Sequence, residues 1–454
     1  MEYQRFIESK SRINSQDGFE PNWIPKWLKD FQKYLVDWAC KTGRSAIFAD
    51  CGMGKTPMQL VWAKNVCKRT GGRVLIVTPL AVYGQTKREA DKFKIESEIS
   101  RDGKYSSDIV LTNYERLHYF SPEDFTGVVC DESSAIKDFK AKRTSYITEF
   151  MRQIKYRLLC TATPAPNDFH ELGTSSESLG YLGFRDMITK FFKMEQSKDY
   201  LGWGRTKYRF RGHAQDPFWQ WVCSWARSMR MPSDMGFSNK GFVLPPLIEN
   251  NVIAKTAQPR PGVLYTTPAR GMKEERQERN HSIRERCEIS AELINAVDGP
   301  AVAWCELNPE GDLLAKLIDD CVQIKGSQSP EEKEEKFELF ATQKVKKLVI
   351  KPKIGAWGLN WQHCSNMSVM ISHSFEQYYQ LVRRCWRFGQ SNPVTVNRIL
   401  CEGQLGILDN LSRKQEQSEQ MFDRIVRNMN DPMLLLSKDK FDELESIPSW
   451  LQRI

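Results

Sequence analysis

The chain has 454 residues, of which 40% are hydrophobic and 27% are charged. This composition excludes a disordered chain, and because one hydrophobic core rarely exceeds about 300 residues, the length predicts two or three domains. The net charge of +9 favours an anionic partner but does not identify it. No stretch approaches the roughly 18 apolar residues of a membrane span, so we expect a cytoplasmic protein without membrane contact.

Twelve cysteines are spread along the chain at irregular spacing. A disulfide framework or a metal site would need paired or clustered cysteines, and no Cys-x-x-Cys pair occurs. We therefore expect scattered reduced thiols, as is usual in cytosolic proteins.

Residues 45–163 alternate between short apolar runs and helix-like stretches. Runs of about four residues rich in Val, Ile and Leu are typical of buried parallel strands, and their alternation with helices indicates a doubly wound α/β sheet. The runs cover residues 45–48, 74–77, 109–111, 128–130 and 157–160. We therefore predict a first α/β lobe over residues 1–164.

Residues 165–245 differ in character, with many basic residues and few β-branched runs, and we predict a helical insertion here. The insertion contains four tryptophans: Trp203, Trp219, Trp221 and Trp225. Two uses of these side chains are open, since aromatic rings stack on bases in some nucleic-acid-binding proteins but more often form ordinary core.

A second series of apolar runs predicts a second α/β lobe over residues 246–430. These runs cover residues 301–304, 321–324, 347–350, 368–371 and 395–399. From residue 405 onwards, charged and apolar residues alternate at helical spacing, which indicates a helix packed back on the lobes. Residues 431–454 are assigned to a C-terminal helical tail.

A glycine-containing loop, residues 49–56, lies between the first predicted strand and a predicted helix. The start of a helix offers free backbone N–H groups and the positive end of a dipole to phosphate oxygens. Lys55 would reach the β and γ phosphates, and Thr56 would ligate Mg²⁺. Ala49 stands where the usual pattern has its first glycine, so the loop is a variant. The expected binding residues are Gly52, Met53, Gly54, Lys55 and Thr56.

Two adjacent carboxylates, Asp131 and Glu132, follow the apolar run 128–130. The tip of a buried strand holds such groups in fixed geometry, so Asp131 can bind magnesium while Glu132 polarises an attacking water. By itself, an acidic pair after a strand is more often a solvated turn. Its position downstream of a phosphate loop favours the catalytic interpretation.

Two weaker signals are polar loops at predicted strand ends. Thr161 and Thr163 could connect the acidic pair to bound nucleic acid, although by themselves two Thr hydroxyls at this position favour an ordinary strand-to-loop turn. In the second lobe, Gly358 and Asn360 lie in a glycine-containing loop that would allow the backbone to approach phosphate.

A pair of arginines in the second predicted lobe is a stronger signal. Arg384 and Arg387 lie three residues apart and share one helix face, so both can point across a cleft at charge developing on a γ-phosphate. An arginine supplied by a second lobe would make hydrolysis depend on lobe closure. The alternative is a basic surface helix.

In this order the motifs resemble helicase superfamily 2 and, within it, the Swi/Snf-type double-stranded DNA translocases. The matching segments are residues 49–56, 131–134, 161–164 and 351–361, together with Gln380, Arg384, Arg387, Gly389 and Gln390. The resemblance implies two RecA-like lobes that bind ATP and Mg²⁺ between them, with Gln380 among the ATP-binding residues. The chain departs from the family at residues 351–352, where a Ser-Thr pair is usual, and at Ser134, where a His is usual.

The same resemblance implies roles for residues nearer the N-terminus. Gln32 would read the adenine base. The segments that would contact nucleic acid on the first lobe contain Thr78, Pro79, Thr112 and Asn113. Because phosphate contacts carry no sequence information, little base specificity is expected.

The expected function is therefore that of an ATP-hydrolysing motor that translocates on nucleic acid, with duplex or branched DNA as the expected partner. Two alternatives stay open: a helicase that separates strands or migrates branches on DNA or RNA, and a recruiting subunit of a replication or nuclease complex. The compact motor is similar to prokaryotic or bacteriophage members of the family, so the cytoplasm of a prokaryotic or phage-infected cell is expected.

Overall fold

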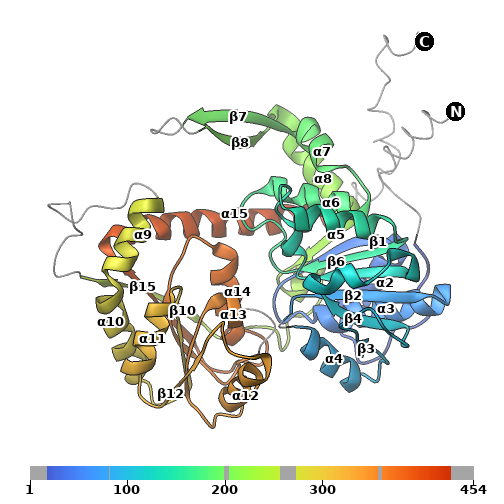
Figure 1. Cartoon of the computed structure of the whole chain (residues 1–454). Helices are drawn as coiled ribbons and strands as arrows, with labels where there is room; N and C mark the ends of the chain where they lie inside the picture. The colour runs from blue at the N-terminus through green and yellow to red at the C-terminus, as the bar shows by residue number, and fades with distance from the viewer. Residues whose placement is uncertain (1–17, 81, 199–203, 256–271, 356–359, 431–454) are drawn as a thin grey trace.

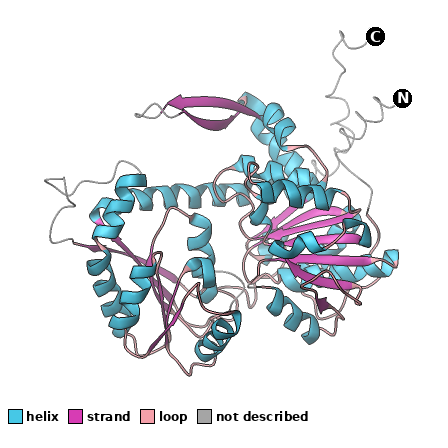
Figure 2. Cartoon of the chain, in the orientation of Figure 1, coloured by secondary structure: helices cyan, strands magenta, loops and turns pink. Residues whose placement is uncertain are grey.

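The computed structural model describes residues 18–80, 82–198, 204–255, 272–355 and 360–430. These residues form two α/β lobes that lie side by side (Figure 1). Each lobe is built on one parallel sheet, with seven strands in lobe 1 and six in lobe 2. In each lobe, helices cover the sheet (Figure 2). The predicted fold class of two doubly wound lobes is confirmed.

Lobe 1 has the strand order β3-β4-β2-β5-β6-β1-β9. The strands are β1 (Arg44–Ala49), β2 (Arg73–Thr78), β3 (Glu98–Ile99), β4 (Ile109–Asn113), β5 (Phe125–Asp131), β6 (Tyr156–Thr161) and β9 (Ala226–Met229). The helices of its first half are α2 (Asp30–Thr42), α3 (Lys55–Thr70), α4 (Tyr83–Lys92) and α5 (Lys142–Arg152).

The core of lobe 1 lies on both faces of this sheet because successive residues of a strand point to opposite faces. Ile47 packs with residues of α2 and α3 on one face, whereas its neighbour Phe48 packs with residues of α5 and α8 (Gln215–Trp225) on the other. Both side chains are at most 1% exposed, and burial of each contributes roughly 1.5–3 kcal/mol. A sheet covered on both faces explains the unbroken apolar runs in the sequence.

Residues 165–245 are of mixed structure, so the prediction of a helical insertion is wrong in two places. The segment contains α6 (Leu172–Leu179), α7 (Phe184–Phe191), the antiparallel pair β7 (Phe192–Lys198) and β8 (Gly204–Phe210), α8 (Gln215–Trp225) and then β9. At the start of β7 and the end of β8, in Phe192-Lys193-Met194-Glu195 and Tyr208-Arg209-Phe210, apolar residues alternate with polar ones, which is the period of a strand rather than a helix. Strand β9 pairs in parallel with β1 and so completes the sheet of lobe 1.

The tryptophans of this segment belong to the core. Trp219 and Trp225 are fully buried and Trp221 is 5% exposed, and all three lie in the cluster that contains Phe48. The core interpretation is therefore confirmed for these three, which excludes stacking of their rings on bases in this conformation. Trp203 lies outside the described residues.

Lobe 2 has the strand order β10-β15-β14-β11-β13-β12. The strands are β10 (Leu247–Ala254), β11 (Ala301–Trp304), β12 (Cys321–Ile324), β13 (Lys347–Ile350), β14 (Asn366–Met370) and β15 (Val394–Cys401). The helices are α9 (Met272–His281), α10 (Ile283–Asn295), α11 (Asn308–Leu317), α12 (Pro330–Ala341), α13 (Pro352–Gly355), α14 (Phe375–Cys385) and α15 (Gly406–Met429).

Helix α15 runs from lobe 2 back to lobe 1 (Figure 1). Its Met421, Phe422 and Ile425 are buried in the same core cluster as Phe48 of lobe 1. The predicted return of a C-terminal helix onto the lobes is thus confirmed over residues 406–429, whereas the predicted tail, 431–454, lies outside the described residues.

Candidate functional site

Polar side chains collect where the lobe 1 strands end. Because β1, β2, β4, β5 and β6 run in parallel, their carboxyl ends lie along one edge of the sheet. This edge brings the loop after β1 next to the acidic pair after β5 and to Thr161 at the end of β6. The structure therefore joins three segments that are far apart in the sequence.

The loop between β1 and α3 has the backbone that a phosphate-binding loop needs. Gly52 and Gly54 have φ angles of 86° and 78°, in the left-handed region that favours glycine. A Cβ atom on Gly54 would lie 2.3 Å from Nε2 of Gln32, so a side chain there would collide with its support. Helix α3 begins at Lys55 and no side chain caps it, which leaves its first N–H groups directed at the site. The Nζ atom of Lys55 donates to the carbonyl oxygen of Ala49 at 3.0 Å.

The acidic pair is held by neutral donors. Asp131 and Glu132 are 4% and 9% exposed. The amide Nε2 of Gln59, one turn after Lys55 in α3, donates to Oδ1 of Asp131 at 2.6 Å. The hydroxyl of Thr161 donates to Oε2 of Glu132 at 3.3 Å. These contacts fix both carboxylates without neutralising them.

Burial changes the proton affinity of these acids. Burial raises the pKa of Glu132 to about 7, an effect that Lys55 opposes and the adjacent charge of Asp131 reinforces. Burial also raises the pKa of Asp131, against the hydrogen bond from Gln59 and the charge of Lys55. Two buried carboxylates side by side are thus short of positive charge, and a bound cation would relieve that deficit.

The donor set at this edge fits magnesium. Mg²⁺ prefers oxygen ligands and often takes only one or two protein carboxylates, with water and phosphate oxygens completing its shell. Asp131 and the hydroxyl of Thr56 at the start of α3 would supply the protein ligands. In the described part of the chain, no group of three or more His, Cys, Asp or Glu side chains is arranged to hold a metal by itself.

Lobe 2 faces this edge with helix α14. Gln380 and Arg384 are buried on that helix, and Nη2 of Arg384 donates to Oε1 of Gln380 at 2.9 Å. The same Oε1 lies 4.0 Å from Sγ of Cys51 in the phosphate loop, so the two lobes are in contact at the site. The charge of Arg384 lies close enough to Glu132 to lower its pKa against the dominant effect of burial.

Arg387 follows α14 and lies beside Arg384. Burial and the charge of Arg384 lower the pKa of Arg387 to about 10, so its guanidinium stays charged at neutral pH. Two guanidinium groups so close together repel each other, and a phosphate anion between them and Lys55 would remove that repulsion.

Three further residues predicted to bind ATP are Gln32, Gly358 and Asn360. Gln32 donates from Nε2 to the carbonyl oxygen of Met53 at 3.0 Å and accepts from the Lys29 N–H at 2.9 Å, so it supports the phosphate loop. Asn360 is exposed, next to residues 356–359, and the predicted contact Gly358 lies outside the described residues.

The predicted nucleic-acid contacts are mostly buried. The buried side chains, at most 3% exposed, are those of Thr78, Thr112, Asn113, Thr161 and Thr163. The hydroxyl of Thr112 donates to the carbonyl oxygen of Ser100 at 3.1 Å, and Oδ1 of Asn113 accepts from the Arg116 N–H at 3.1 Å. Pro79 is half-buried, and the next residue, Leu80, is 56% exposed.

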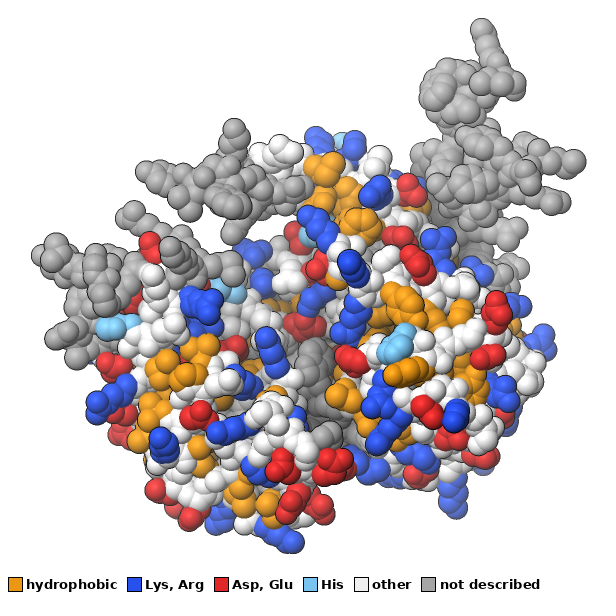
Figure 3. Space-filling view, viewed as in Figure 1, with side chains coloured by type: hydrophobic (Ala, Val, Ile, Leu, Met, Phe, Trp, Pro, Cys, Tyr) orange, Lys and Arg blue, Asp and Glu red, His pale blue; other side chains and the backbone are white. Residues whose placement is uncertain are grey.

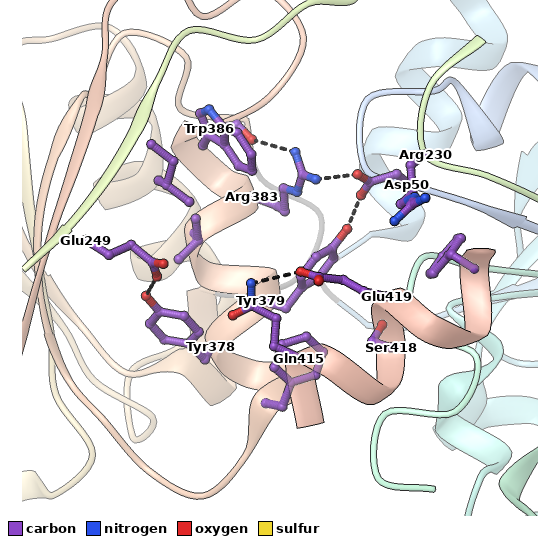
Figure 4. A pocket seen from close by; sticks show the side chains of 14 residues that line it. Asp50, Arg230, Glu249, Tyr378, Tyr379, Arg383, Trp386, Gln415, Ser418 and Glu419 are labelled. Atoms are coloured by element: carbon purple, nitrogen blue, oxygen red, sulfur yellow. Dashed lines mark hydrogen bonds and ion pairs between the residues drawn. The ribbon is translucent and has the colours of Figure 1, made fainter. Parts of the chain in front are cut away.

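Sequence reasoning missed Gln59 and a contact between the lobes. In that contact, Arg383 and Tyr379 of α14 both bind the carboxylate of Asp50, the first residue after β1 (Figure 4). The i,i+4 spacing of Lys55 and Gln59 in one helix was a sequence signal that Gln59 belongs to the site. No sequence signal was available for the second, because it depends on how the lobes meet.

A cavity of about 240 Å³ lies beside this contact (Figure 4). It is lined mainly by residues of α14, α15 and the start of β10, and its walls combine aromatic and aliphatic side chains with charged and polar ones. Asp50, Tyr379 and Arg383 form part of its lining, which places the cavity next to the interlobe contact.

The surface carries both signs of charge. On the face shown in Figure 3, Lys and Arg side chains are spread over both lobes among Asp and Glu side chains. Among the described helices, none combines the length and apolar character required to span a membrane.

These features define a two-lobed α/β protein with a cluster of charged and polar side chains shared between its lobes. No protein-family model matches the chain. Over 170 residues, it is 26% identical to a Caenorhabditis elegans protein, the SWI/SNF-related matrix-associated actin-dependent regulator of chromatin subfamily A-like protein 1 homolog; the match covers 34% of this chain and 24% of that protein. Over 203 residues, it is 25% identical to the human chromatin-remodeling ATPase INO80, covering 37% of this chain and 13% of that protein.

The chain thus spans a quarter or less of the length of these curated relatives. A solved structure, the Sulfolobus solfataricus SWI2/SNF2 ATPase core in complex with dsDNA, is 17% identical, covers 94% of this chain and 98% of its own, and has a TM-score of 0.42. Over about a third of its length, the chain is therefore similar to Swi/Snf-type ATPases, in agreement with the resemblance of its motifs. None of these relatives is described as a bacteriophage protein.

Proposed function

We propose that this protein is an ATP-hydrolysing motor of the Swi/Snf type that moves on duplex DNA. One observation carries the proposal: Glu132 of lobe 1 lies within electrostatic reach of both Lys55 in its own lobe and Arg384 in the other. A base, a phosphate-binding cation and an arginine from a second lobe are the parts that phosphoryl transfer to water requires.

The residues divide the proposed chemistry between them. Bound Mg²⁺ and ATP would supply the phosphoanhydride bond and the metal charge. Lys55 and the first N–H groups of α3 would hold the phosphates, while Asp131 and Thr56 hold the metal. Glu132 would orient the attacking water and take up its proton, and Arg384 and Arg387 would neutralise charge on the transferred phosphoryl group.

We propose that nucleic acid lies across the strand-end edges of both lobes. Since the hydroxyls of Thr78 and Thr112 are buried, their segments would make contact through backbone groups and exposed neighbours such as Leu80. Lys142 on lobe 1 and Lys353 on lobe 2 are exposed after β5 and β13 and are candidates for phosphate contacts. The buried Thr161, whose hydroxyl donates a hydrogen bond to Glu132, would couple this surface to hydrolysis.

The test is the rate of ATP hydrolysis with duplex DNA, single-stranded DNA, forked DNA and RNA, at one stated salt concentration because phosphate-driven binding weakens steeply with salt. We expect duplex DNA to stimulate hydrolysis more than single strands do. Glu132→Gln is the control, since it keeps the shape of the site and removes the base. Stimulation by duplex DNA that is no greater than stimulation by single-stranded DNA would count against a Swi/Snf-type motor. A wild-type rate equal to that of Glu132→Gln with every nucleic acid would refute the proposed ATPase activity.

A second candidate, strand separation, is favoured by the hairpin β7–β8, which projects from lobe 1 (Figure 1). Lys193, Met194 and Arg209 are exposed on it, so it offers both phosphate-binding charge and an apolar side chain to a fork. Displacement of a third strand from a triplex without unwinding of a forked duplex would favour translocation, and unwinding of the fork would favour this second candidate.

A further inference from the structure

Helix α14 presents two different arginines to lobe 1. Arg384 lies near Glu132, whereas its neighbour Arg383 forms an ion pair with the carboxylate of Asp50. Consecutive residues of a helix point about 100° apart, so the two side chains serve different parts of lobe 1. In Figure 4, Arg383 and Tyr379 converge on Asp50 from the same helix.

The pair is buried and well supported. Asp50 is 5% and Arg383 is 8% exposed. The guanidinium of Arg383 lies 4.3 Å from the ring centre of Trp386 and 5.3 Å from that of Tyr379, both within the range of cation–π contact. While α14 lies against lobe 1, removal of either partner would leave the other charge buried without a counter-charge, so the two side chains depend on each other.

Asp50 transmits this contact to the phosphate loop. The carboxylate oxygen that accepts from Tyr379 also accepts the N–H of Cys51 at 2.5 Å. The carbonyl oxygen of Asp50 lies 3.5 Å from Nζ of Lys55. The orientation of the first loop peptides is therefore set from lobe 2, through one side chain of lobe 1.

A second contact fixes the other end of the same helix. Glu376, in the first turn of α14, pairs with Lys137, five residues after Glu132. Helix α14 is thus tied both to the phosphate loop and to the segment that follows the acidic pair. Two contacts at separate positions on α14 restrict the orientation of the helix as well as its distance from lobe 1.

We propose that Arg383 is a positioning residue: together with Tyr379 it holds the phosphate loop through Asp50, and so aligns the loop with Arg384 and Arg387 when the lobes close. The role in alignment rests on the proposed ATP hydrolysis, whereas the role in ordering the loop does not. The guanidinium of Arg383 is paired with the carboxylate of Asp50, so Arg383 acts on the loop through that side chain.

The first experiment measures amide hydrogen exchange of residues 49–56 in the nucleotide-free full-length protein. We expect Arg383→Gln and Asp50→Asn each to speed exchange of the loop about tenfold, and the double variant to be no faster than the faster single one, because both remove the same interaction. Arg284→Gln, which removes an exposed Arg–Glu pair on α10, is the matched control and should leave the loop unchanged. Additive effects, or loop exchange at the wild-type rate in both single variants, would overturn the proposal.

Milder variants separate positioning from a general loss of folding. Tyr379→Phe removes only the hydroxyl that donates to Asp50 and should speed loop exchange about threefold, while Arg383→Lys, which keeps the charge, should restore part of the protection. If unfolding of lobe 1 caused the effect, exchange would rise across its whole sheet and Lys would not rescue the loop selectively.

The second experiment measures steady-state hydrolysis of ATP. For Arg383→Gln we expect kcat to fall about tenfold with a change in KM of less than about threefold, because alignment in the closed state is lost while Lys55 still binds phosphate. An unchanged kcat would overturn the role in alignment. If even the wild type shows no hydrolysis, the proposed function fails, and the exchange experiment still decides whether Arg383 orders the loop.

Discussion

Lobe 1 contributes to the site from the ends of three strands, β1, β5 and β6, and from the start of helix α3, whereas lobe 2 contributes from a single helix and the turn that follows it. The lobe 1 groups are fixed to each other, as in the bonds from Gln59 to Asp131 and from Thr161 to Glu132. The lobe 2 groups reach Glu132 only because α14 is held against lobe 1. Under the proposed function, nucleotide binding would therefore depend mainly on lobe 1, while the complete catalytic set would require contact between the two lobes.

The sharpest test of this division is Arg387→Ala. If Arg387 acts only in the closed site, we expect the rate of ATP hydrolysis to fall about 10³-fold, while the affinity for ATP, which depends on Lys55 and α3, changes by less than about fivefold. The measurement pairs steady-state rates with equilibrium binding of a non-hydrolysed analogue. A parallel loss of binding and rate would place Arg387 in the binding half instead, and Arg284→Ala on α10 is the control for loss of an exposed arginine.

Gln59→Ala tests the lobe 1 half by itself. Removal of the amide that donates to Asp131 leaves the ligand free to turn, and loss of such a supporting hydrogen bond typically weakens a metal site about tenfold or more. We expect the Mg²⁺ concentration for half-maximal hydrolysis to rise about tenfold. Gln153→Ala, an exposed residue after α5, is the matched control. An unchanged Mg²⁺ requirement would show that Asp131 does not depend on Gln59.

The smallest expected effect concerns stability and pH. In the folded protein, burial raises the pKa of Glu132 from 4.5 to about 7. Between these two pH values, the folded chain therefore keeps a proton on Glu132 that the unfolded chain releases. The stability gained in this way is fully present below about pH 4.5 and is lost as the pH rises through about 7. Without metal, Glu132→Gln should therefore raise the free energy of unfolding by roughly 1–2 kcal/mol at pH 8 and by less at pH 5.

Urea unfolding in the presence of a chelator measures this difference. An equal gain in the free energy of unfolding at both pH values would mean that the proton on Glu132 does not contribute. Saturating Mg²⁺ should reduce the gain at pH 8, because the metal charge then stabilises the ionised pair in the wild type.

The sequence predicted most of the fold for a physical reason. Strands such as β1 and β5 are buried on both faces, so they consist of unbroken apolar runs that stand out from their surroundings. Strand β9, with the sequence Ala-Arg-Ser-Met, lies at the edge of the sheet and lacks such a run, and it was missed. The hairpin β7–β8 was missed because its alternation of apolar and polar residues was obscured by the many charges around it.

The residues of the site likewise fall into those that the sequence identified and those that it did not. Lys55, Asp131 and Glu132 were identifiable because each lies at or soon after the end of a strand, within a compact motif. The partnership of Asp50 with Arg383 spans 333 positions and joins two lobes, and no local pattern encodes how two separately folded units meet. The burial of Thr78 and Thr112 was equally invisible, because a Thr at a strand end has the same spacing whether it is exposed or covered.

Helix α15 gives the two lobes a second connection, made by side-chain packing. The chain passes once from β9 into β10 and then returns through α15, whose 24 residues measure about 36 Å, to anchor Phe422 and Ile425 in the core of lobe 1. Two attachment points define an axis, and rotation of the lobes about that line would preserve both, whereas pulling the lobes apart would break the packing of α15 on lobe 1. Any stroke of the proposed motor would therefore be an arc of fixed radius, and its length would be set by the distance from that axis to the surface that contacts the nucleic acid.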